Sequence, residues 1–225
     1  MIKPKGRHEI KHYINTVDFI QLRSRLPCVA KPDENAATGN CYRVRSLYFD
    51  NYSDKALREK IDGVNEREKF RLRLYNDDIT FIRLEKKSKR GGFCYKESAV
   101  ISAELCRQLL DGRYEALKED GSPLLLELYV KMHSQLLRPK NIVEYQREAY
   151  LFPAGNVRIT LDYDIRACLD VNSFLDPALV TIPIPNRIIL EVKYDAFLPE
   201  IIRGMVSLSS RQQSAFSKYA ATRIR

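Results

Sequence analysis

The chain has 225 residues, of which 44% are hydrophobic and 30% are charged, a composition typical of a globular protein and not of a disordered one. It contains no run of 18 apolar residues, so we expect no membrane-spanning helix. The net charge of +9 and the pI near 9.3 indicate an anionic partner such as phosphate, nucleic acid or a membrane surface.

Alternation and helical periodicity predict an α+β protein that forms one domain over residues 1–225. Ser102 and Ser122 are good helix N-caps, and Pro123 occupies the first helical position after Ser122. Further helices are expected over 16–26, with Thr16 as a plausible N-cap, and over 53–62, which starts with Ser53. The last helix is expected at roughly 209–222, and strands are expected at about 7–12, 41–49, 69–75, 80–87, 93–101, 142–151, 156–163 and 187–194.

Loops and turns separate these elements. Residues 29–40 are expected to form a surface loop, and 75–80 a turn. Gly91 and Gly92 predict a hairpin turn within 88–93, because glycine reaches the backbone angles that tight hairpins need. The five cysteines are widely spaced without a CxxC pair, and no apolar stretch follows the basic N-terminal residues. Both features predict a cytoplasmic protein with reduced thiols.

One face of nearly every predicted strand is polar and mainly basic. In "KFRLRLY" the apolar Phe70 and Leu72 lie on one face, and Arg71 and Arg73 on the other. On strand 41–49, Arg43 and Arg45 are assigned to the polar face. The polar faces together carry twelve basic residues, Arg7, Lys11, Arg43, Arg45, Arg71, Arg73, Arg83, Lys87, Lys96, Arg147, Arg158 and Lys193, and four acidic ones, Glu9, Glu85, Asp162 and Glu191.

Two interpretations explain this bias. A half-exposed sheet would have a merely charged solvent face, and for a single strand this is the better explanation. A solvated face normally mixes signs, however, because like charges repel. The difference of +8 on these faces is nearly the whole net charge of +9. This favours an antiparallel β-barrel of about eight strands with helices packed on its outside and a basic interior that holds a repeatedly negative ligand.

Such an interior suits phosphate chemistry. Arginine pairs with phosphate oxygens through two nitrogens, whereas lysine acts as a point charge. The few carboxylates are candidates for Mg²⁺ or Mn²⁺ ligands, because these ions are commonly held by one or two carboxylates together with substrate phosphates. Glu191 is the first candidate and Glu9 the second, and an ordinary salt bridge is the competing interpretation of Glu191. Phosphoryl transfer needs mainly positioning and charge neutralisation.

Other chemistries have less support. The three histidines form no ligand cluster, and His8 and His12 fall on the presumed outer face. The sequence has no P-loop, GxSxG motif or zinc spacing. Single-stranded nucleic acid would require aromatic residues among the cations, and Tyr145 is the only one that falls directly beside a basic residue. We therefore expect no nucleic-acid partner.

Eight segments stand out in order along the chain: "RHEIKHYI", "VRSLYFDN", "KFRLRLYN", "RLEKKSKRGGFCYKE", "VEYQREAY", "VRITLDYDIR", "ILEVKYDAFLPE" and "SAFSKYAATR". Together they resemble the VTC domain, the polyphosphate polymerase domain of the vacuolar transporter chaperone complex and its bacterial relatives, and the match runs from about Arg7 to Arg225. The VTC domain belongs to the triphosphate tunnel metalloenzymes. The resemblance therefore implies an antiparallel barrel that binds triphosphate with a divalent metal, and transfer of the γ-phosphate of ATP to a phosphate chain.

The resemblance also implies roles for single residues. Glu191 would bind Mn²⁺ or Mg²⁺, with Glu9 as the second candidate, and Lys218 on the last helix would close one end of the tunnel. Tyr145 and Ser217 would add hydrogen bonds to the substrate, and Arg45 and Lys193 are further candidate substrate ligands from the basic faces. The phosphates themselves would be held by Lys11, Arg71, Arg73, Lys87, Lys96, Arg147 and Arg158.

The sequence departs from the family pattern in two places. The superfamily motif Glu-x-Glu-x-Lys is reduced here to Glu9 and Lys11, which favours the polymerase branch over the triphosphatase and cyclase branches. Where the family often has Ser-Lys-x-Ser-Lys-Tyr, this chain has Ser214-Ala215-Phe216-Ser217-Lys218-Tyr219, so one lysine is missing.

The sequence is consistent with three functions: an ATP- and metal-dependent polyphosphate polymerase, a triphosphatase of the same fold, and a non-catalytic polyphosphate-binding accessory module. ATP and polyphosphate or triphosphate are the expected partners. Any membrane attachment would require a partner protein.

Overall fold

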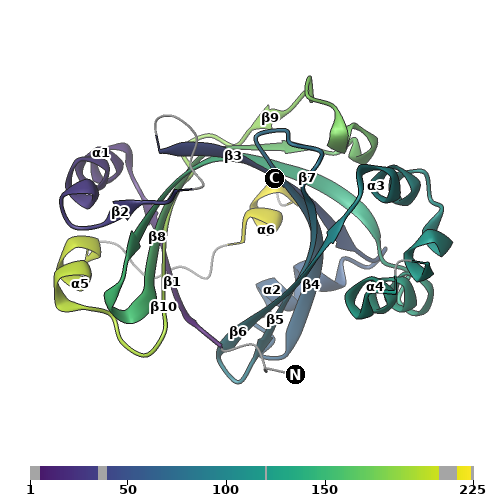
Figure 1. Ribbon diagram of the computed structural model, residues 1–225, viewed down its shortest axis with the longest axis horizontal. Coiled ribbons are helices and arrows are strands. Elements are labelled where there is room, and N and C mark those ends of the chain that lie inside the picture. The colour runs from purple at the N-terminus through teal and green to yellow at the C-terminus, as the bar shows by residue number, and fades with distance from the viewer. Residues whose placement is uncertain (1–5, 35–39, 120, 208–216, 224–225) are drawn as a thin grey trace.

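A computed structural model describes residues 6–34, 40–119, 121–207 and 217–223 (Figure 1). Ten strands form one antiparallel sheet, in which eight strands follow the order β1-β10-β8-β7-β3-β4-β5-β6, while β2 pairs with β7 and β9 pairs with β8. The strands are β1 (His8–Ile14), β2 (Lys31–Pro32), β3 (Cys41–Asp50), β4 (Arg67–Tyr75), β5 (Ile82–Arg90), β6 (Phe93–Ile101), β7 (Arg138–Phe152), β8 (Val157–Cys168), β9 (Ile182–Pro183) and β10 (Ile188–Tyr194).

The sheet curls until its two ends meet. An isolated antiparallel bridge between Arg7 and Cys94 brings β1 beside β6, at opposite ends of the strand order. In Figure 1 the strands surround a central space, with most helices outside it. The prediction of an antiparallel tunnel of about eight strands is thereby confirmed. The two-residue strands β2 and β9 were not predicted, because two residues are too few to establish an alternation.

The α-helices lie between and after the strands. The start of α1 is fixed by Asn15, whose side chain accepts from the Asp18 amide at 2.8 Å, while the Asp18 carboxylate accepts from the Asn15 amide. The prediction that the helix cap lies at Thr16 was therefore wrong by one residue. The helices are α1 (Thr16–Arg25), α2 (Lys55–Ile61), α3 (Ala103–Leu110), α4 (Pro123–Ser134), α5 (Glu200–Val206) and α6 (Lys218–Arg223).

Three of these helices differ from the sequence expectation. α5 was not predicted. α2 begins after Asp54, and Ser53 does not cap it. The expected helix at 209–222 coincides with α6 only at its end, because residues 208–216 lie outside the described part of the chain. No described helix is long and apolar enough to cross a bilayer.

Apolar side chains pack on both sides of the curled sheet. Outside, α3 and α4 cover β4 and β5 in a cluster that includes Leu72, Leu84 and Leu128. Also outside, α1 and α5 cover β8 and β10. A third cluster lies inside the ring, where Tyr219 of α6 packs with Tyr48 and Val143 (Figure 1, yellow helix). α6 thus fills part of the interior, which leaves the rest for polar side chains.

The expected hairpin turn between β5 and β6 is present. Gly91 and Gly92 have φ angles of 55° and 85°, in the left-handed region that glycine adopts without strain. This turn sets the pairing of β5 with β6, and so decides which side chains of the two strands face the interior together.

Candidate functional site

A cavity of about 430 Å³ occupies the interior of the ring, and we call it the tunnel. Fourteen Arg and Lys side chains line it, against only Glu9 and Glu68 among the acids. Most of them come from the strands, and Lys60 comes from α2. Because the chain folds these cations around one space, the excess positive charge seen in the sequence is concentrated there.

One wall of the tunnel carries a row of three lysines on adjacent strands. Lys69 of β4 is paired in register with Lys87 of β5, and Lys87 is paired with Lys96 of β6. Like charges directly opposite each other destabilise a sheet. Lys96 is compensated by Glu85 at 2.5 Å, whereas Lys69 and Lys87 form no ion pair with any residue of the described segments.

The pKa values of these two lysines reflect that environment. Burial, together with the charges of Arg71 and Lys11, lowers the pKa of Lys69 to about 8. Burial and the charges of Lys193 and Arg71 hold the pKa of Lys87 well below its usual value. An anion between the lysines would reverse both shifts, so this wall is prepared for a strongly negative ligand.

Arg71 and Arg73 stand next to the lysine row and are almost completely buried. The Arg71 guanidinium donates to Glu85 at 2.7 and 2.5 Å, and Arg73 lies 3.8 Å from the same carboxylate. Arg73 also donates to the hydroxyls of Ser46 and Tyr145, both at 3.1 Å. Burial would raise the pKa of Glu85, but Arg71, Arg73 and Lys96 outweigh it and hold that pKa far below normal. Glu85 therefore orients these cations as a permanent anion.

The adjoining wall, formed by β1 and β10 next to β6, alternates in charge. On β1 and β10, Lys11 pairs in register with Glu191, and Glu9 pairs with Lys193. Glu191 lies 3.3 Å from Lys11 and 2.5 Å from Lys193, and Glu9 contacts both lysines. Burial disfavours the Glu191 charge, but Lys11 and Lys193 more than offset this and hold its pKa well below normal. This wall offers carboxylate oxygens and ammonium groups side by side.

A further group of charges lies beside α6, inside the ring. Arg147 forms two hydrogen bonds with Asp162, at 2.6 and 2.7 Å, and Lys218 contacts the same carboxylate. Burial raises the pKa of Asp162, but Arg147 and Lys218 lower it to about 2, so the carboxylate stays charged. Ser217 lines the tunnel beside this group, and the Tyr145 ring lies under the Lys218 ammonium inside the ring of strands.

Most of the predicted site residues come together around this cavity. The tunnel lining itself includes Lys11, Arg71, Arg73, Lys87, Lys96, Arg147, Arg158, Lys193, Ser217 and Glu9. Glu191 and Tyr145 contact lining residues, and Lys218 shares the Asp162 carboxylate with Arg147. Arg158 is held at the edge by Asp33 at 2.5 Å and by the Tyr42 hydroxyl at 3.0 Å.

Arg45 is the exception, and its predicted place was wrong. It lies on the outer face of β3, where its guanidinium pairs with Glu144 at 2.8 Å and Asp77 at 2.9 Å. Arg43 shares this face and pairs with Asp77. The prediction assumed that Val44 and Tyr48 point to an outer apolar core. They point instead to the apolar cluster around α6, so both faces of β3 are covered and polarity alone does not reveal which is inside.

Several tunnel residues were not among the candidates. Lys69 alternates with Arg71 and Arg73 on one strand face, so the period-two pattern alone would have found it. Arg67 and Lys89, which are paired in register at the end of β4 and β5, follow the same rule. Lys60 belongs to α2, and no sequence pattern connects that helix to the tunnel.

The family model of the VTC domain matches residues 6–224. The chain belongs to the VTC domain family. The family prediction is thus confirmed, and the match covers every element that lines the tunnel. A search of the curated proteins found no match.

Solved structures share the fold of this VTC domain at low sequence identity. A candidate adenylate cyclase of Bacillus halodurans is 12% identical, with a TM-score of 0.51 over 85% of this chain and 82% of that one. A protein of Pyrococcus horikoshii is 12% identical, with a TM-score of 0.52 over 94% and 96%. A protein of Pyrococcus furiosus is 11% identical, with a TM-score of 0.52 over 96% and 99%. At these identities the likeness concerns the fold alone.

The tunnel can be tested against the divalent cation that a tunnel metalloenzyme uses. The described residues contain no cluster of three or more His, Cys, Asp or Glu side chains suited to a metal. Glu9 and Glu191, however, share Lys11 and Lys193 as neighbours. The Thr160 hydroxyl, opposite Glu191 in register, is buried and finds no hydrogen-bond partner in the described segments. Two carboxylates and a spare hydroxyl fit Mg²⁺ or Mn²⁺ that shares substrate phosphate oxygens.

Proposed function

We propose that this VTC domain is an ATP- and divalent-metal-dependent polyphosphate polymerase. The observation that carries the proposal is the row of Lys69, Lys87 and Lys96 on one wall, next to a wall on which carboxylates alternate with lysines. The first wall has more cations than the protein neutralises. The second has anions as well. A chain of phosphates with a divalent cation complements both.

The tunnel residues would act by positioning and neutralisation. In the reaction, a terminal oxygen of the phosphate chain forms a bond to the γ-phosphorus of ATP, and the bond from that phosphorus to the β–γ bridging oxygen breaks. The electron pair leaves with the β-phosphate, so ADP is released. Arg71 and Arg73 are held by Glu85, so their guanidinium groups are oriented before the substrate binds.

The remaining groups have separate tasks. Lys69 and Lys87 supply charge that is not compensated within the described protein, so phosphate oxygens gain most from them. Glu9 and Glu191 would hold Mg²⁺ or Mn²⁺, which neutralises charge on the transferred phosphate. Arg147 and Lys218, fixed by Asp162, would hold phosphates at the α6 end.

A product assay tests the proposal. The protein is incubated with ATP and Mn²⁺, and long-chain polyphosphate, ADP and free phosphate are measured. Polymer with equivalent ADP supports polymerisation. Free phosphate without polymer identifies a triphosphatase, and binding without turnover identifies an accessory module; either result refutes the polymerase.

A variant pair ties the activity to the tunnel. Lys87→Met removes a cation of the lysine row and should lower phosphate transfer by at least about a hundredfold. Lys118→Met removes an exposed lysine outside the tunnel and should leave transfer unchanged. Equal activity of the two variants would contradict the assignment of the tunnel as the active site.

A further inference from the structure

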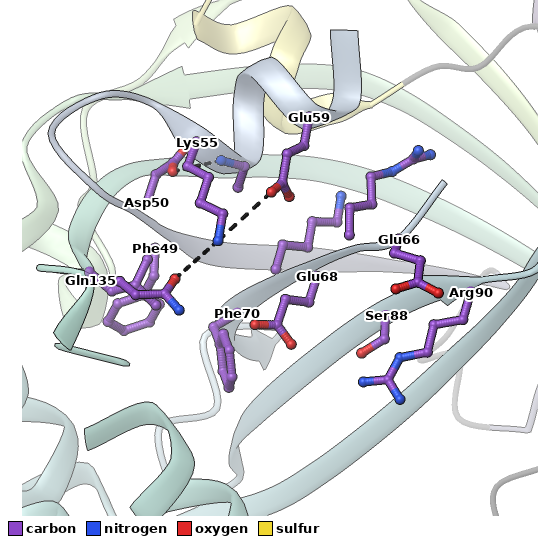
Figure 2. A pocket seen from close by; sticks show the side chains of 14 residues that line it. Phe49, Asp50, Lys55, Glu59, Glu66, Glu68, Phe70, Ser88, Arg90 and Gln135 are labelled. Carbon is purple, nitrogen blue, oxygen red and sulfur yellow. Dashed lines mark hydrogen bonds and ion pairs between the residues drawn. The ribbon is translucent and has the colours of Figure 1, made fainter. Parts of the chain in front are cut away.

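A second cavity opens beside the tunnel and shares part of its wall (Figure 2). It has a volume of about 310 Å³ and lies between α2, the β4–β5 hairpin and the residues that follow α4. We call it the side cavity. Five residues line both spaces, namely Ala56, Arg67, Glu68, Lys69 and Ser88. A single ligand that is long enough to pass these residues would therefore occupy both cavities at once.

The two cavities differ in charge. Fourteen cations and two acids line the tunnel, whereas four cations and four acids line the side cavity. Its lining includes the buried rings of Phe49 and Phe70. Two of its four acids are Glu59 of α2 and Glu66, which precedes β4 (Figure 2). A polyphosphate chain would meet carboxylates there and gain little, so a different chemical group suits this space.

The polar groups of the side cavity suit a neutral ligand with donors and acceptors on its edge. Lys55 lies 3.3 Å from the Gln135 side-chain oxygen and 3.8 Å from the Glu59 carboxylate, and Figure 2 draws both contacts. An ammonium, an amide and a carboxylate above an apolar base are what a nucleobase and its ribose hydroxyls require. The volume is at the lower end of small-molecule sites, which fits a nucleoside.

We propose that the side cavity binds the nucleoside half of a nucleoside triphosphate whose phosphates lie in the tunnel. Arg67 and Lys69, at the junction, would then contact the phosphate nearest the ribose. The inference rests on the proposed function, because it requires triphosphate in the tunnel. The inference goes beyond the proposed function because it assigns a separate site to the nucleoside. It therefore predicts that the protein distinguishes ATP from inorganic tripolyphosphate.

Calorimetric titration of the full chain with ATP and with inorganic tripolyphosphate tests the inference. Two changes remove nucleoside contacts without altering net charge, Gln135→Ala and the double variant Lys55→Gln/Glu59→Gln. Each should weaken ATP binding about tenfold, the loss of one or two hydrogen bonds, and leave tripolyphosphate binding unchanged. The double variant Glu115→Gln/Lys118→Gln, which removes an exposed pair 2.6 Å apart, is the matched control and should change neither.

Each outcome is decisive. Selective loss of ATP affinity supports the nucleoside site, and retained tripolyphosphate binding shows that the variants are folded. Equal affinities for ATP in the variants and the parent overturn it while leaving the proposed function intact. An equal loss of affinity for ATP and for tripolyphosphate also overturns the inference, since the substitutions in the side cavity would then have disturbed the phosphate site in the tunnel. If the parent protein binds neither ligand, the proposed function itself fails, and the nucleoside site fails with it.

Discussion

The hydroxyl of Tyr219 donates a 2.7 Å hydrogen bond to Asp50, and this contact holds α6 inside the ring of strands. Asp50 also accepts from the amides of Ala56 and Leu57 in the first turn of α2. The Tyr219 ring stacks on Tyr48 with 5.1 Å between ring centres. One buried carboxylate thus connects the C-terminal helix, the helix above the side cavity and the interior of the tunnel.

Tyr219→Phe should keep the ring stacking and lose the hydrogen bond. Because the acceptor is a charged and buried group, we expect a loss of about 1.5–3 kcal/mol in the free energy of unfolding. Urea denaturation measures it. Tyr129→Phe is the control, because that hydroxyl bonds to the exposed Glu115 and its loss should cost much less. Equal losses would mean that Asp50 does not anchor α6.

Glu85→Gln should destabilise the free protein and increase its response to phosphate. The change removes the anion shared by Arg71, Arg73 and Lys96, which leaves two buried arginines crowded beside a partly exposed lysine. Breaking a buried pair in this way costs about 3–5 kcal/mol. Inorganic tripolyphosphate should restore part of the lost stability. The rise in Tm on adding tripolyphosphate should therefore be larger for Glu85→Gln than for the parent protein.

A surface variant controls for the loss of a carboxylate as such. Glu104→Gln breaks an exposed pair with Arg107 and should leave both Tm and the tripolyphosphate response unchanged. A Glu85→Gln protein that gains no more than the parent would argue that Glu85 does not compete with phosphate for these cations.

Binding of tripolyphosphate should weaken as pH rises through about 8. The pKa of Lys69 in the free protein is about 8, so the lysine loses its charge above that pH. The charged and titratable groups around it are Tyr48, Arg71, Lys11 and Glu9. The lowered pKa of Lys69 also makes the free energy of unfolding depend on pH. Since the folded pKa is lowered, the unfolded chain binds more protons between pH 8 and the ordinary value of 10.5, and this group makes stability rise with pH there.

Affinity measured by calorimetry between pH 7 and 9.5 tests this behaviour. Lys69→Arg keeps its charge over the whole range and should flatten the part of the pH dependence that Lys69 causes; Lys87, whose pKa is also lowered, causes the remainder. An unchanged profile in Lys69→Arg would exclude Lys69 from the phosphate site.

The sequence predicts the tunnel well because charge and period-two alternation agree on most strands. On β4 and β5 the apolar face packs under α3 and α4 and the basic face lines the tunnel, so polarity alone identifies the inside. The pattern fails on β3, where Val44 packs against α6 inside the ring and Arg45 is buried outside it. Which face of such a strand is inner depends on a helix far along the chain, and no local pattern contains that information.

The side cavity shows the same limit for a binding site. α2 contributes Lys55 and Glu59, β4 contributes Glu68, and Gln135 follows α4. None belongs to a motif, and their distances in the sequence are large. Only the packing of α2 against β4 brings them together. By contrast, the carboxylates of β1 and β10 were predictable, because they interrupt otherwise basic strand faces.

Arg45→Met should destabilise the fold without affecting the site. The Arg45 side chain is buried and binds Glu144, Asp77 and the carbonyl oxygens of Phe174 and Asp176, at 3.1 and 2.6 Å for the carbonyls. Removing it leaves Glu144 with only Arg43, at 4.0 Å, and takes one of two arginine partners from Asp77. We expect a loss of about 3–5 kcal/mol in the free energy of unfolding. The affinity of the folded variant for tripolyphosphate should equal that of the parent. Weakened binding would return Arg45 to the list of substrate ligands.

Glu191→Gln should separate metal binding from phosphate binding. The amide keeps the shape of the side chain but is a poor ligand for Mn²⁺, so phosphate transfer from ATP should fall by at least about a hundredfold. Lys11 and Lys193 lose a partner and remain available to phosphate, so binding of tripolyphosphate without metal should not weaken. Electron paramagnetic resonance can count the Mn²⁺ held together with a non-hydrolysable ATP analogue, and that count should drop in the variant.

A matched carboxylate outside the tunnel completes the test. Glu97 lies on the outer face of β6, where it pairs with Lys86 at 3.6 Å, so Glu97→Gln should keep both transfer and Mn²⁺ binding. Removing Mn²⁺ from the parent with a chelator should reproduce the loss of transfer in Glu191→Gln, because both treatments remove the same charge from the phosphates. If Glu191→Gln instead turns over normally with an unchanged dependence on Mn²⁺, the carboxylate is a salt-bridge partner of Lys11 and Lys193, and the metal must be held elsewhere.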